Sequence, residues 1–306
     1  MGRDLAENFA GARAVFEQAD QALGFSLSKL CFEGPAEELR LTENTQPAIL
    51  AVSAAATQAL AEKGIQPDYV AGHSLGEYSA LVAAGAIRLQ DAARLVHKRG
   101  QYMQEAVPIG DGAMAALLGL GPAAVEEVCR EAAQGQLVSP ANWNSPGQVV
   151  IAGHVTAVQR AIDLAKVRGA KRAVLLDVSA PFHCALMRPA AERLAVDLDA
   201  SDFSNLRMPL VNNVDARVLG SAAEVRDGLK RQVTAPVLWE QSMRVLRAEG
   251  VDLLVEVGPG KVLSGLLRQI DRQAECLRVE NRSTLNETLE TVQRHFEPGE
   301  TRIEYT

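Results

Sequence analysis

The segment Gly72-His-Ser-Leu-Gly76 places Ser74 between two glycines in the spacing G-x-S-x-G. It follows residues 68–72, which have the character of a short buried strand, and precedes residues 76–85, which have that of a helix. In this context the pattern is typical of a nucleophilic serine on a sharp turn, and the next amide, that of Leu75, can stabilise an oxyanion. A serine that only caps the helix would give the same pattern, so the motif alone leaves both roles open.

A serine hydroxyl needs a general base, and histidine is the commonest one. The chain has five candidates: His73, His97, His154, His183 and His295. His183 follows a strand and the rigid Pro181 in V-S-A-P-F-H-C, on a loop that can aim a side chain into a cleft. His73 adjoins the serine, but neighbouring side chains at a strand end point apart. His97 is expected in the middle of a helix, His154 at the end of a strand and His295 near the tail. We expect all three to be surface residues. A hydrogen-bonded surface role also stays open for His183.

Composition limits the classes of function. The chain has 306 residues, 47 % of them apolar and 23 % charged, with a net charge of −7, which argues against sequence-independent binding of nucleic acid. The apolar runs are too short to span a membrane, and the N-terminus lacks a secretory signal. The four cysteines are widely separated, so we expect reduced thiols, no metal site and a cytoplasmic location.

The elements that must position the serine alternate between strands and helices, which indicates an α/β fold. Outside residues 112–179, we expect helices at 3–22, 46–63, 76–85, 90–106, 185–198, 224–232, 237–249 and 285–296, and strands at 68–72, 208–213, 252–257 and 275–279. The tail, residues 298–306, is expected to fray.

Residues 112–179 have an order of their own. Strand, helix, two strands, helix and strand follow one another there, which is the β-α-β-β-α-β order of a ferredoxin-like unit. We therefore expect a small subdomain at 112–179, inserted into a larger domain made of 1–111 and 180–306.

Seven blocks in this sequence resemble the malonyl-CoA:acyl-carrier-protein transacylases, the acyltransferases that load malonyl groups for fatty-acid synthesis. Between about residue 41 and residue 266 they are L-T-E-N-T-Q-P-A-I-L, A-G-H-S-L-G-E-Y-S-A-L-V-A-A-G, K-R-G-Q-Y-M-Q, S-P-A-N-W-N-S-P-G-Q-V-V-I-A-G, V-S-A-P-F-H-C-A-L-M, R-Q-V-T-A-P-V-L-W and V-E-V-G-P-G-K-V-L-S-G-L. Seven blocks in the family's order are far more specific than one G-x-S-x-G. The resemblance implies a large α/β-hydrolase-like domain with a parallel sheet, carrying the ferredoxin-like insert.

The resemblance also implies roles for single residues. Ser74 would become malonylated, His183 would act as its base and acid, and the backbone carbonyl of Gln232 would orient the imidazole. The Leu75 amide would belong to the oxyanion hole, and Arg99 would hold the free malonyl carboxylate through parallel N–H bonds.

Further implications concern the pocket and the partners. Asn144 would line the pocket, and the ring of Phe182 would leave little room for a 2-methyl branch on the substrate. The implied partners are malonyl-CoA and an acyl carrier protein, whose phosphopantetheine thiol accepts the malonyl group. No cofactor is implied, and we expect a monomer. A basic patch of Lys171, Arg172, Lys261 and Arg268 is a candidate surface for the acidic carrier.

One feature of the family is missing. The family normally opens with a strand and a G-Q-G-S-Q loop whose amide is the second oxyanion donor, and these 306 residues contain no such loop. A chain that starts at Met1 is expected to lack one central strand and half the oxyanion hole, and one lost donor costs about 10²–10³ in rate. Two alternatives stay open, the first because it uses the same serine nucleophile and the second because of the missing loop. One is a serine thioesterase or esterase, with Asp177 as the nearest acid, and the other is an impaired form that only binds carrier protein.

Overall fold

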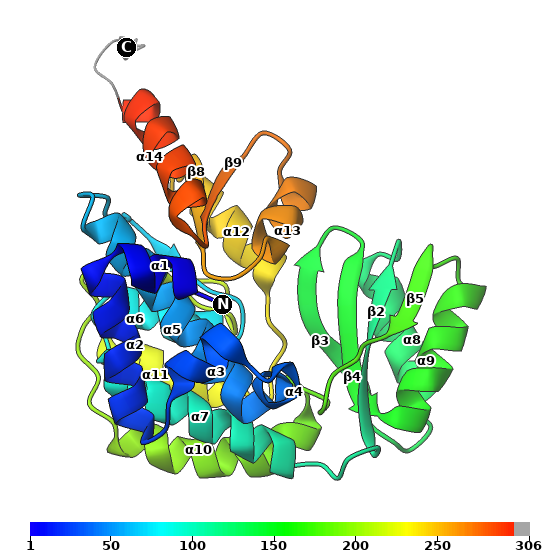
Figure 1. The fold of residues 1–306 in the computed structure, drawn as a ribbon. Helices are drawn as coiled ribbons and strands as arrows, with labels where there is room; N and C mark the ends of the chain where they lie inside the picture. Colours follow the sequence, from blue (N-terminus) through cyan, green and yellow to red (C-terminus); the bar gives the residue numbers. More distant parts are fainter. Residues whose placement is uncertain (297–306) are drawn as a thin grey trace.

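Two lobes of unequal size lie side by side in the computed structural model, which describes residues 1–296 (Figure 1). The large lobe combines helices with short parallel strand pairs, and the small lobe is an antiparallel sheet covered by two helices. The expected α/β class is therefore confirmed. The tail expected to fray lies outside the described residues. Within residues 1–296, no helix is long and apolar enough to cross a membrane.

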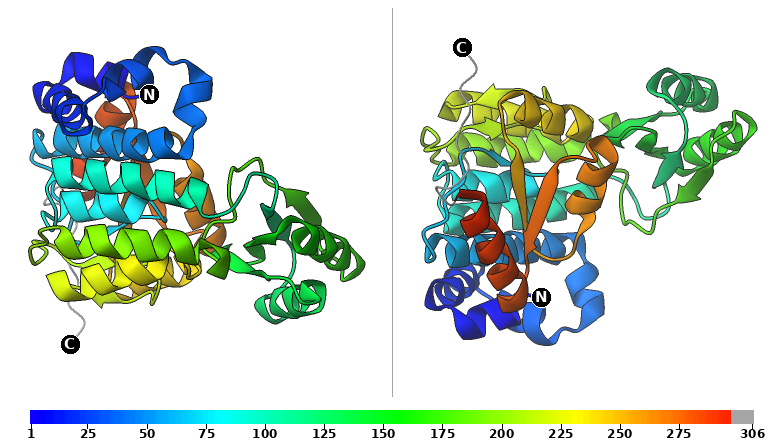
Figure 2. Two further views of the ribbon diagram at one scale, coloured as in Figure 1. Left: turned by 90° about the horizontal axis from the view of Figure 1, so that it is seen from below. Right: turned by 90° about the horizontal axis from the view of Figure 1, so that it is seen from above.

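The large lobe is mainly helical. Its helices are α1 (Arg3–Asn8), α2 (Ala10–Leu23), α3 (Leu27–Glu33), α4 (Ala36–Arg40), α5 (Thr42–Ala61), α6 (Gly76–Ala83), α7 (Leu89–Glu105), α10 (Arg188–Ala200, after a 3₁₀ turn at Ala185–Met187), α11 (Ala222–Gln232), α12 (Trp239–Ala248), α13 (Val262–Ile270) and α14 (Arg282–Phe296). Figure 2 shows α2, α5, α7, α10 and α11 following one another across the lobe. The alanine-rich α5 is buried on nearly all sides, because small side chains let α2 and α7 approach it closely.

The N-terminal helix prediction was wrong in one respect. The expected helix at 3–22 breaks at Phe9, whose backbone is extended with φ −130° and ψ 124°. Helix α2 then begins at Ala10. The first N–H groups of a new helix have no partner within it, and the Gly11 N–H finds one in Glu62 Oε1 at 2.7 Å. Helices α3 and α4 were not expected, because they are too short for a helical period to show.

The strands of the large lobe form two hydrogen-bonded units. Strand β1 (Val70–Ala71) pairs in parallel with β6 (Leu210–Val211), which pairs with the short antiparallel β7 (Val218–Leu219). Strands β8 (Leu253–Val257) and β9 (Glu275–Val279) form a separate parallel pair. Parallel pairing agrees with the prediction, whereas β7 was not foreseen. Strands β1 and β6 end earlier than expected, because the Asn213 side chain bonds to the Ser74 N–H and to the Gly72 carbonyl in place of ladder bonds.

The small lobe has the topology expected of a ferredoxin-like unit. Its elements are β2 (Gly112–Leu118), α8 (Pro122–Ala133), β3 (Val138–Ser145), β4 (Gln148–His154), α9 (Val155–Val167) and β5 (Arg172–Leu175). The strands are antiparallel in the order β3-β4-β2-β5. Helices α8 and α9 cover one face through Val128, Ile162 and their neighbours. The opposite face packs Met114 and Ala152 against Cys184 of the large lobe.

Strand β3 connects the two lobes. The Trp143 N–H donates to the Val237 carbonyl, and the Val237 N–H donates to the Ala141 carbonyl, both at 2.9 Å. The Ser145 hydroxyl donates to Gln269 Oε1 at 2.9 Å. These bonds hold the end of β3, and Asn144 with it, against the large lobe.

Candidate active site

Ser74 lies on a strained turn between β1 and α6. Its φ is 53°, in the left-handed region that non-glycine residues rarely occupy. A Cβ on Gly72 would lie 2.0 Å from the backbone of Gly76, so only glycine allows this approach, whereas a Cβ at Gly76 would meet nothing. The Ser74 hydroxyl does not cap α6. It is aimed at other side chains, and the helix-cap alternative is therefore wrong.

The histidine that reaches Ser74 is His183. Its Nε2 lies 2.7 Å from Ser74 Oγ, and its Nδ1 lies 2.9 Å from the backbone carbonyl of Gln232. A carbonyl only accepts, so Nδ1 carries the hydrogen and Nε2 presents its lone pair to the serine. His183 also has a positive φ, of 57°. The structure thus brings together the serine, the imidazole and the orienting carbonyl that the sequence had suggested.

The electrostatics favour a neutral imidazole. Burial, reinforced by the positive charge of Arg99, lowers the pKa of His183 to about 3. Its side chain is only 3 % exposed. At neutral pH the imidazole is therefore unprotonated and free to accept the serine proton, as a general base must be.

Arg99 of α7 lies beside the same hydroxyl and is 2 % exposed. Its Nη2 donates to Ser74 Oγ at 3.1 Å and to Gln232 Oε1 at 3.0 Å, and its Nη1 donates to Gln46 Oε1 at 2.7 Å. The ring of Tyr78 lies 5.6 Å from the guanidinium carbon. The Nε–H has no partner among the described residues. A fixed cation with a spare donor beside the nucleophile is suited to a substrate anion.

The Leu75 amide is available as a further donor. Within residues 1–296 it donates no hydrogen bond, although the next two amides do: Gly76 N–H bonds to the His73 carbonyl at 2.9 Å and Glu77 N–H to the Ser74 carbonyl at 3.1 Å. It lies at the start of α6, where the helix dipole favours negative charge. This position is the one an oxyanion donor requires.

The small lobe contributes to one wall of the site. Asn144 Oδ1 lies 2.8 Å from His73 Nε2, and the His73 ring packs on Trp239. His73 thus points away from the serine, and burial lowers its pKa. Phe182 is half-buried and packs against the apolar cluster around Met114. Asn144 therefore contacts His73 next to the serine, and Phe182 packs against an apolar cluster to which both lobes contribute.

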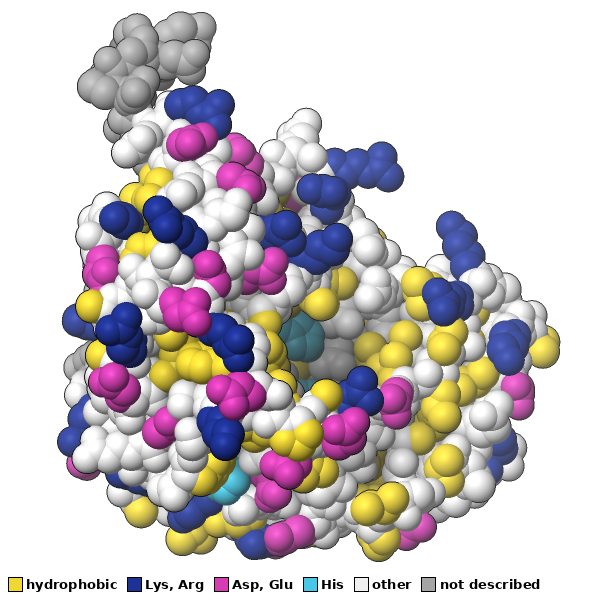
Figure 3. Space-filling model, in the orientation of Figure 1, with side chains coloured by type: hydrophobic (Ala, Val, Ile, Leu, Met, Phe, Trp, Pro, Cys, Tyr) yellow, Lys and Arg dark blue, Asp and Glu magenta, His cyan; other side chains and the backbone are white. Residues whose placement is uncertain are grey.

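A hollow separates the lobes on the face shown in Figure 3, with a histidine visible in its wall and Lys and Arg side chains along its rim. The four basic residues singled out in the sequence are all exposed: Lys171, Arg172, Lys261 and Arg268.

The remaining histidines serve local structure. His97 bonds to the Glu43 carbonyl, the Leu137 N–H bonds to His154 Nδ1, and His295 pairs with Asp252. Asp177, the acid that a hydrolase triad would have used, is exposed beyond the end of β5. Among residues 1–296, no group of three or more His, Cys, Asp or Glu side chains is arranged to hold a metal ion.

Sequence reasoning missed three buried polar residues of the site. Gln46 holds Arg99, Asn213 accepts the Ser74 N–H at 2.7 Å, and Glu77 accepts from Gln232 at 2.8 Å. Asn213 could have been found, because it ends a predicted parallel strand at the same sheet edge as the serine. Glu77 could have been noticed as the only charged residue of α6.

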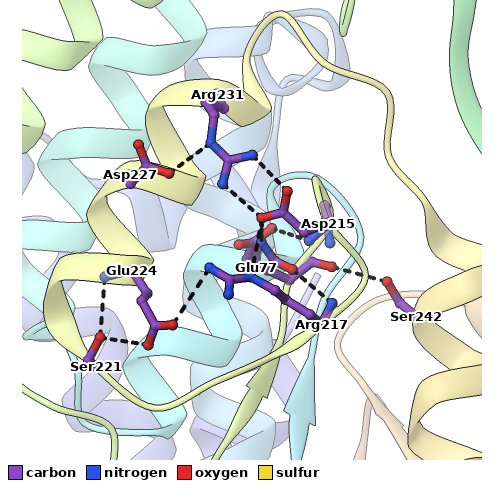
Figure 4. Close-up of polar contacts among 10 residues, drawn as sticks. Glu77, Asp215, Arg217, Ser221, Glu224, Asp227, Arg231 and Ser242 are labelled. Atoms are coloured by element: carbon purple, nitrogen blue, oxygen red, sulfur yellow. Dashed lines mark hydrogen bonds and ion pairs between the residues drawn. The ribbon is translucent and has the colours of Figure 1, made fainter.

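A network of charged side chains joins α11 to the turn between β6 and β7 (Figure 4). Asp215, in the turn between β6 and β7, accepts two hydrogen bonds of 2.8 Å from Arg231 of α11. A further bond of 3.0 Å comes from the Asn212 amide. The Arg231 hydrogen bonds hold the pKa of Asp215 far below its usual range. The pair fastens the β6–β7 turn to the helix that ends in Gln232.

A serine hydrogen-bonded to a buried histidine, with a free amide beside the serine, is an arrangement suited to acyl transfer through a serine ester. The model of the acyl transferase domain matches residues 1–289, and the chain belongs to this acyl transferase family.

Several malonyl transacylases and their solved structures are similar to this chain. The malonyl CoA-acyl carrier protein transacylase of Escherichia coli (strain K12) is 52 % identical over 268 residues, 87 % of each chain. The crystal structure of an acyl carrier protein S-malonyltransferase from Vibrio cholerae has a TM-score of 0.92 and 47 % identity, and covers 94 % of both chains. The malonyl-transacylase PlMCAT, solved in complex with the type II PKS acyl-carrier protein AntF, has a TM-score of 0.93 and 48 % identity over 95 % of this chain and 94 % of that one. The family expected from the seven sequence blocks is confirmed.

Proposed function

We propose that this chain transfers a malonyl group from malonyl-CoA, through an ester on Ser74, to the phosphopantetheine thiol of an acyl carrier protein. One observation carries the proposal. Ser74 Oγ lies 2.7 Å from His183 Nε2 and 3.1 Å from Arg99 Nη2, so a nucleophile, its base and a carboxylate-binding cation meet at one atom. The names of the relatives above point to the same substrate and acceptor.

In the first half-reaction His183 Nε2 takes the Ser74 proton as Oγ attacks the thioester carbonyl. The Leu75 N–H stabilises the oxyanion of the tetrahedral intermediate. Collapse breaks the carbon–sulfur bond, and the imidazolium returns its proton to the departing CoA thiolate. The product is malonyl-Ser74 and free CoA thiol.

The second half-reaction reverses these steps with a new thiol. The carrier arm enters the hollow, His183 takes its thiol proton, and the sulfur attacks the malonyl-serine ester. Collapse releases Ser74 Oγ, which regains the proton from His183. The balance is one thioester exchanged for another, so no cofactor is required.

The free carboxylate of the malonyl group gives the selectivity. Arg99 would bind it through paired N–H donors, including the Nε–H that has no partner among residues 1–296. An acetyl group leaves that buried cation without an anion, which is costly. Phe182 would exclude a 2-methyl branch, and Asn144 would bound the pocket from the small lobe.

The proposal extends to the organisation of the chain. Residues 1–111 with 180–306 would be the catalytic unit, and 112–179 the inserted unit. We expect the chain to work in the cytoplasm, as a monomer and without a cofactor. The absence of any paired cysteine motif supports the expectation of a reducing, cytoplasmic location.

The alternative acceptor is water. A thioesterase of this type commonly orients its histidine with a carboxylate, whereas His183 bonds to a backbone carbonyl, and a neutral ester would not need Arg99. Transfer of labelled malonyl from CoA to holo-carrier and to apo-carrier tests the choice. We expect label on the holo form only and none with Ser74→Ala. Release of free malonate at the same rate with and without carrier would contradict the proposal.

A further inference from the structure

Glu77 is a buried acid that the reaction steps above do not use. It is the second residue of α6, and none of its surface is exposed. Its Oε2 accepts from Gln232 Nε2 at 2.8 Å and from the Asn213 backbone N–H at 3.1 Å. Its Oε1 has no partner among the described residues. Burying a carboxylate with one unsatisfied oxygen is expensive, so a functional reason for it is worth seeking.

Glu77 constrains the side-chain amide of Gln232. That amide lies between two kinds of neighbour, Arg99, which can only donate, and the Ser74 carbonyl, which can only accept. Gln232 Oε1 accepts from Arg99 at 3.0 Å, and its Nε2 donates to the Ser74 carbonyl at 3.1 Å. An ionised Glu77 is a second, stronger acceptor on the Nε2 side. It therefore fixes which end of the amide faces the arginine.

Gln232 in turn hydrogen-bonds both Arg99 and His183. Its side chain holds Arg99, and its backbone carbonyl holds His183 Nδ1 at 2.9 Å. Glu77 also holds the Asn213 backbone, whose side chain accepts the Ser74 N–H and donates to the Gly72 carbonyl, both at 2.7 Å. One carboxylate thus joins the serine turn to the two segments that position the base and the cation.

We propose that Glu77 is a positioning residue, which as an acceptor-only carboxylate orients Gln232 so that Arg99 and His183 are aligned on Ser74. The inference rests on the proposed function, because malonyl transfer is what requires both alignments at once. Protonated Glu77 could donate instead of accept, and the Gln232 amide could then rotate and turn its N–H groups towards Arg99.

The state of Glu77 changes within the working range of pH. Burial raises its pKa to about 7, against the hydrogen bonds from Gln232 and Asn213 and the charge of Arg99 on α7. Asp215, in the β6–β7 turn, adds a smaller repulsion that also raises it. The aligned, ionised form should therefore be lost as the pH falls through about 7. His183, with a pKa of about 3, does not titrate in this window.

The test compares Glu77→Gln with a matched control, Glu256→Gln. Glu256 is also a carboxylate at a helix start, where it accepts from the Leu263 and Ser264 amides of α13. For the wild type, kcat/KM for malonyl-CoA with holo-carrier should fall on acidification with a midpoint near 7. Glu77→Gln should lower kcat/KM about 10- to 100-fold at pH 8, as expected for a lost bond to a charged group, and should remove that midpoint. Glu256→Gln should keep it.

A second variant and a labelling assay test the role of Glu77 in other ways. Gln232→Met retains the backbone carbonyl but lacks the amide, so it should also lose the midpoint, and adding Glu77→Gln to it should cost no more. The rate at which a fluorophosphonate labels Ser74 should show the same midpoint without any malonyl substrate. If the wild type labels in this way yet transfers no malonyl, the proposed function fails and the role of Glu77 stands. A wild-type midpoint that persists in Glu77→Gln, or one that is absent from the wild type, would overturn the inference.

Discussion

Replacement of Arg99 by methionine removes the cation and keeps most of the side-chain volume. In the structure the guanidinium is 2 % exposed and donates to Ser74, Gln232 and Gln46. A substrate carboxylate bound there is a buried, hydrogen-bonded charge pair, and truncating one partner of such a pair costs about 2–5 kcal/mol. At about 1.4 kcal/mol per factor of ten, kcat/KM for malonyl-CoA should fall roughly 30- to 4,000-fold.

The selectivity ratio is the informative quantity. The acetyl group of acetyl-CoA has no carboxylate, so its kcat/KM falls only through the effect of the substitution on Ser74 and on the packing of the site. That damage is common to both substrates and cancels in the ratio. The ratio of malonyl to acetyl transfer should therefore fall by a factor within the same 30- to 4,000-fold range, roughly.

The assay measures both thioesters as competing donors to one holo-carrier. Arg99→Lys is the matched control: it keeps the charge as a point cation and loses the forked donors, so its ratio should lie between wild type and Arg99→Met. Loss of the positive charge in Arg99→Met should also raise the pKa of His183, since that charge helps to depress it. Equal losses of activity towards malonyl-CoA and acetyl-CoA would refute the role of Arg99 in binding carboxylate.

Three other changes have defined outcomes. Asn213→Ala leaves two buried backbone groups of the serine turn without partners, each worth about 1–3 kcal/mol, so urea unfolding should show a loss of that order and kcat should fall with it. The pKa of Glu77 is about 7 in the folded state and 4.5 ordinarily, so its protonation adds to the stability of the fold as the pH falls from 7 to 4.5. The pKa of His183 is about 3 in the folded state and 6.5 ordinarily, so His183 lowers the stability of the fold as the pH falls from 6.5 to 3. Relative to wild type, Glu77→Gln should lose up to about 1.4 kcal/mol of stability per pH unit on acidification through the first window; parallel curves would contradict the pKa of Glu77. Phe182→Ala should raise methylmalonyl transfer relative to malonyl transfer; an unchanged ratio in competition assays would reject the steric role.

Much of the site could be anticipated because its parts stand at recognisable points of the chain. Ser74 follows a strand within a glycine-framed turn, and His183 follows a proline-stiffened loop. Arg99 could not be distinguished from a solvated helical arginine by spacing. Its burial depends on how α7 packs against α5, which is a tertiary property. Only the ordered blocks of the family singled it out in the sequence.

The supporting residues were missed for a physical reason. Glu77, Asn213 and Gln46 act through hydrogen bonds to residues 53 to 155 positions away, and no local period records such contacts. The helix break at Phe9 has a similar origin, since Glu62 supplies the partner for the restarted helix from a distant part of the chain. Local pattern located the elements, whereas the contacts between them decided where helices end and which polar groups are buried.

The most direct test of malonyl transfer through Ser74 is to trap the acyl-enzyme. The chain is mixed with malonyl-CoA, quenched in acid, digested and analysed by mass spectrometry, with and without a chase of holo-carrier. Transfer through Ser74 predicts one malonyl group on the peptide that contains Ser74, stable to water over the chase and transferred to the carrier thiol. A malonyl group on another residue, or loss to water as fast as to the carrier, would contradict it.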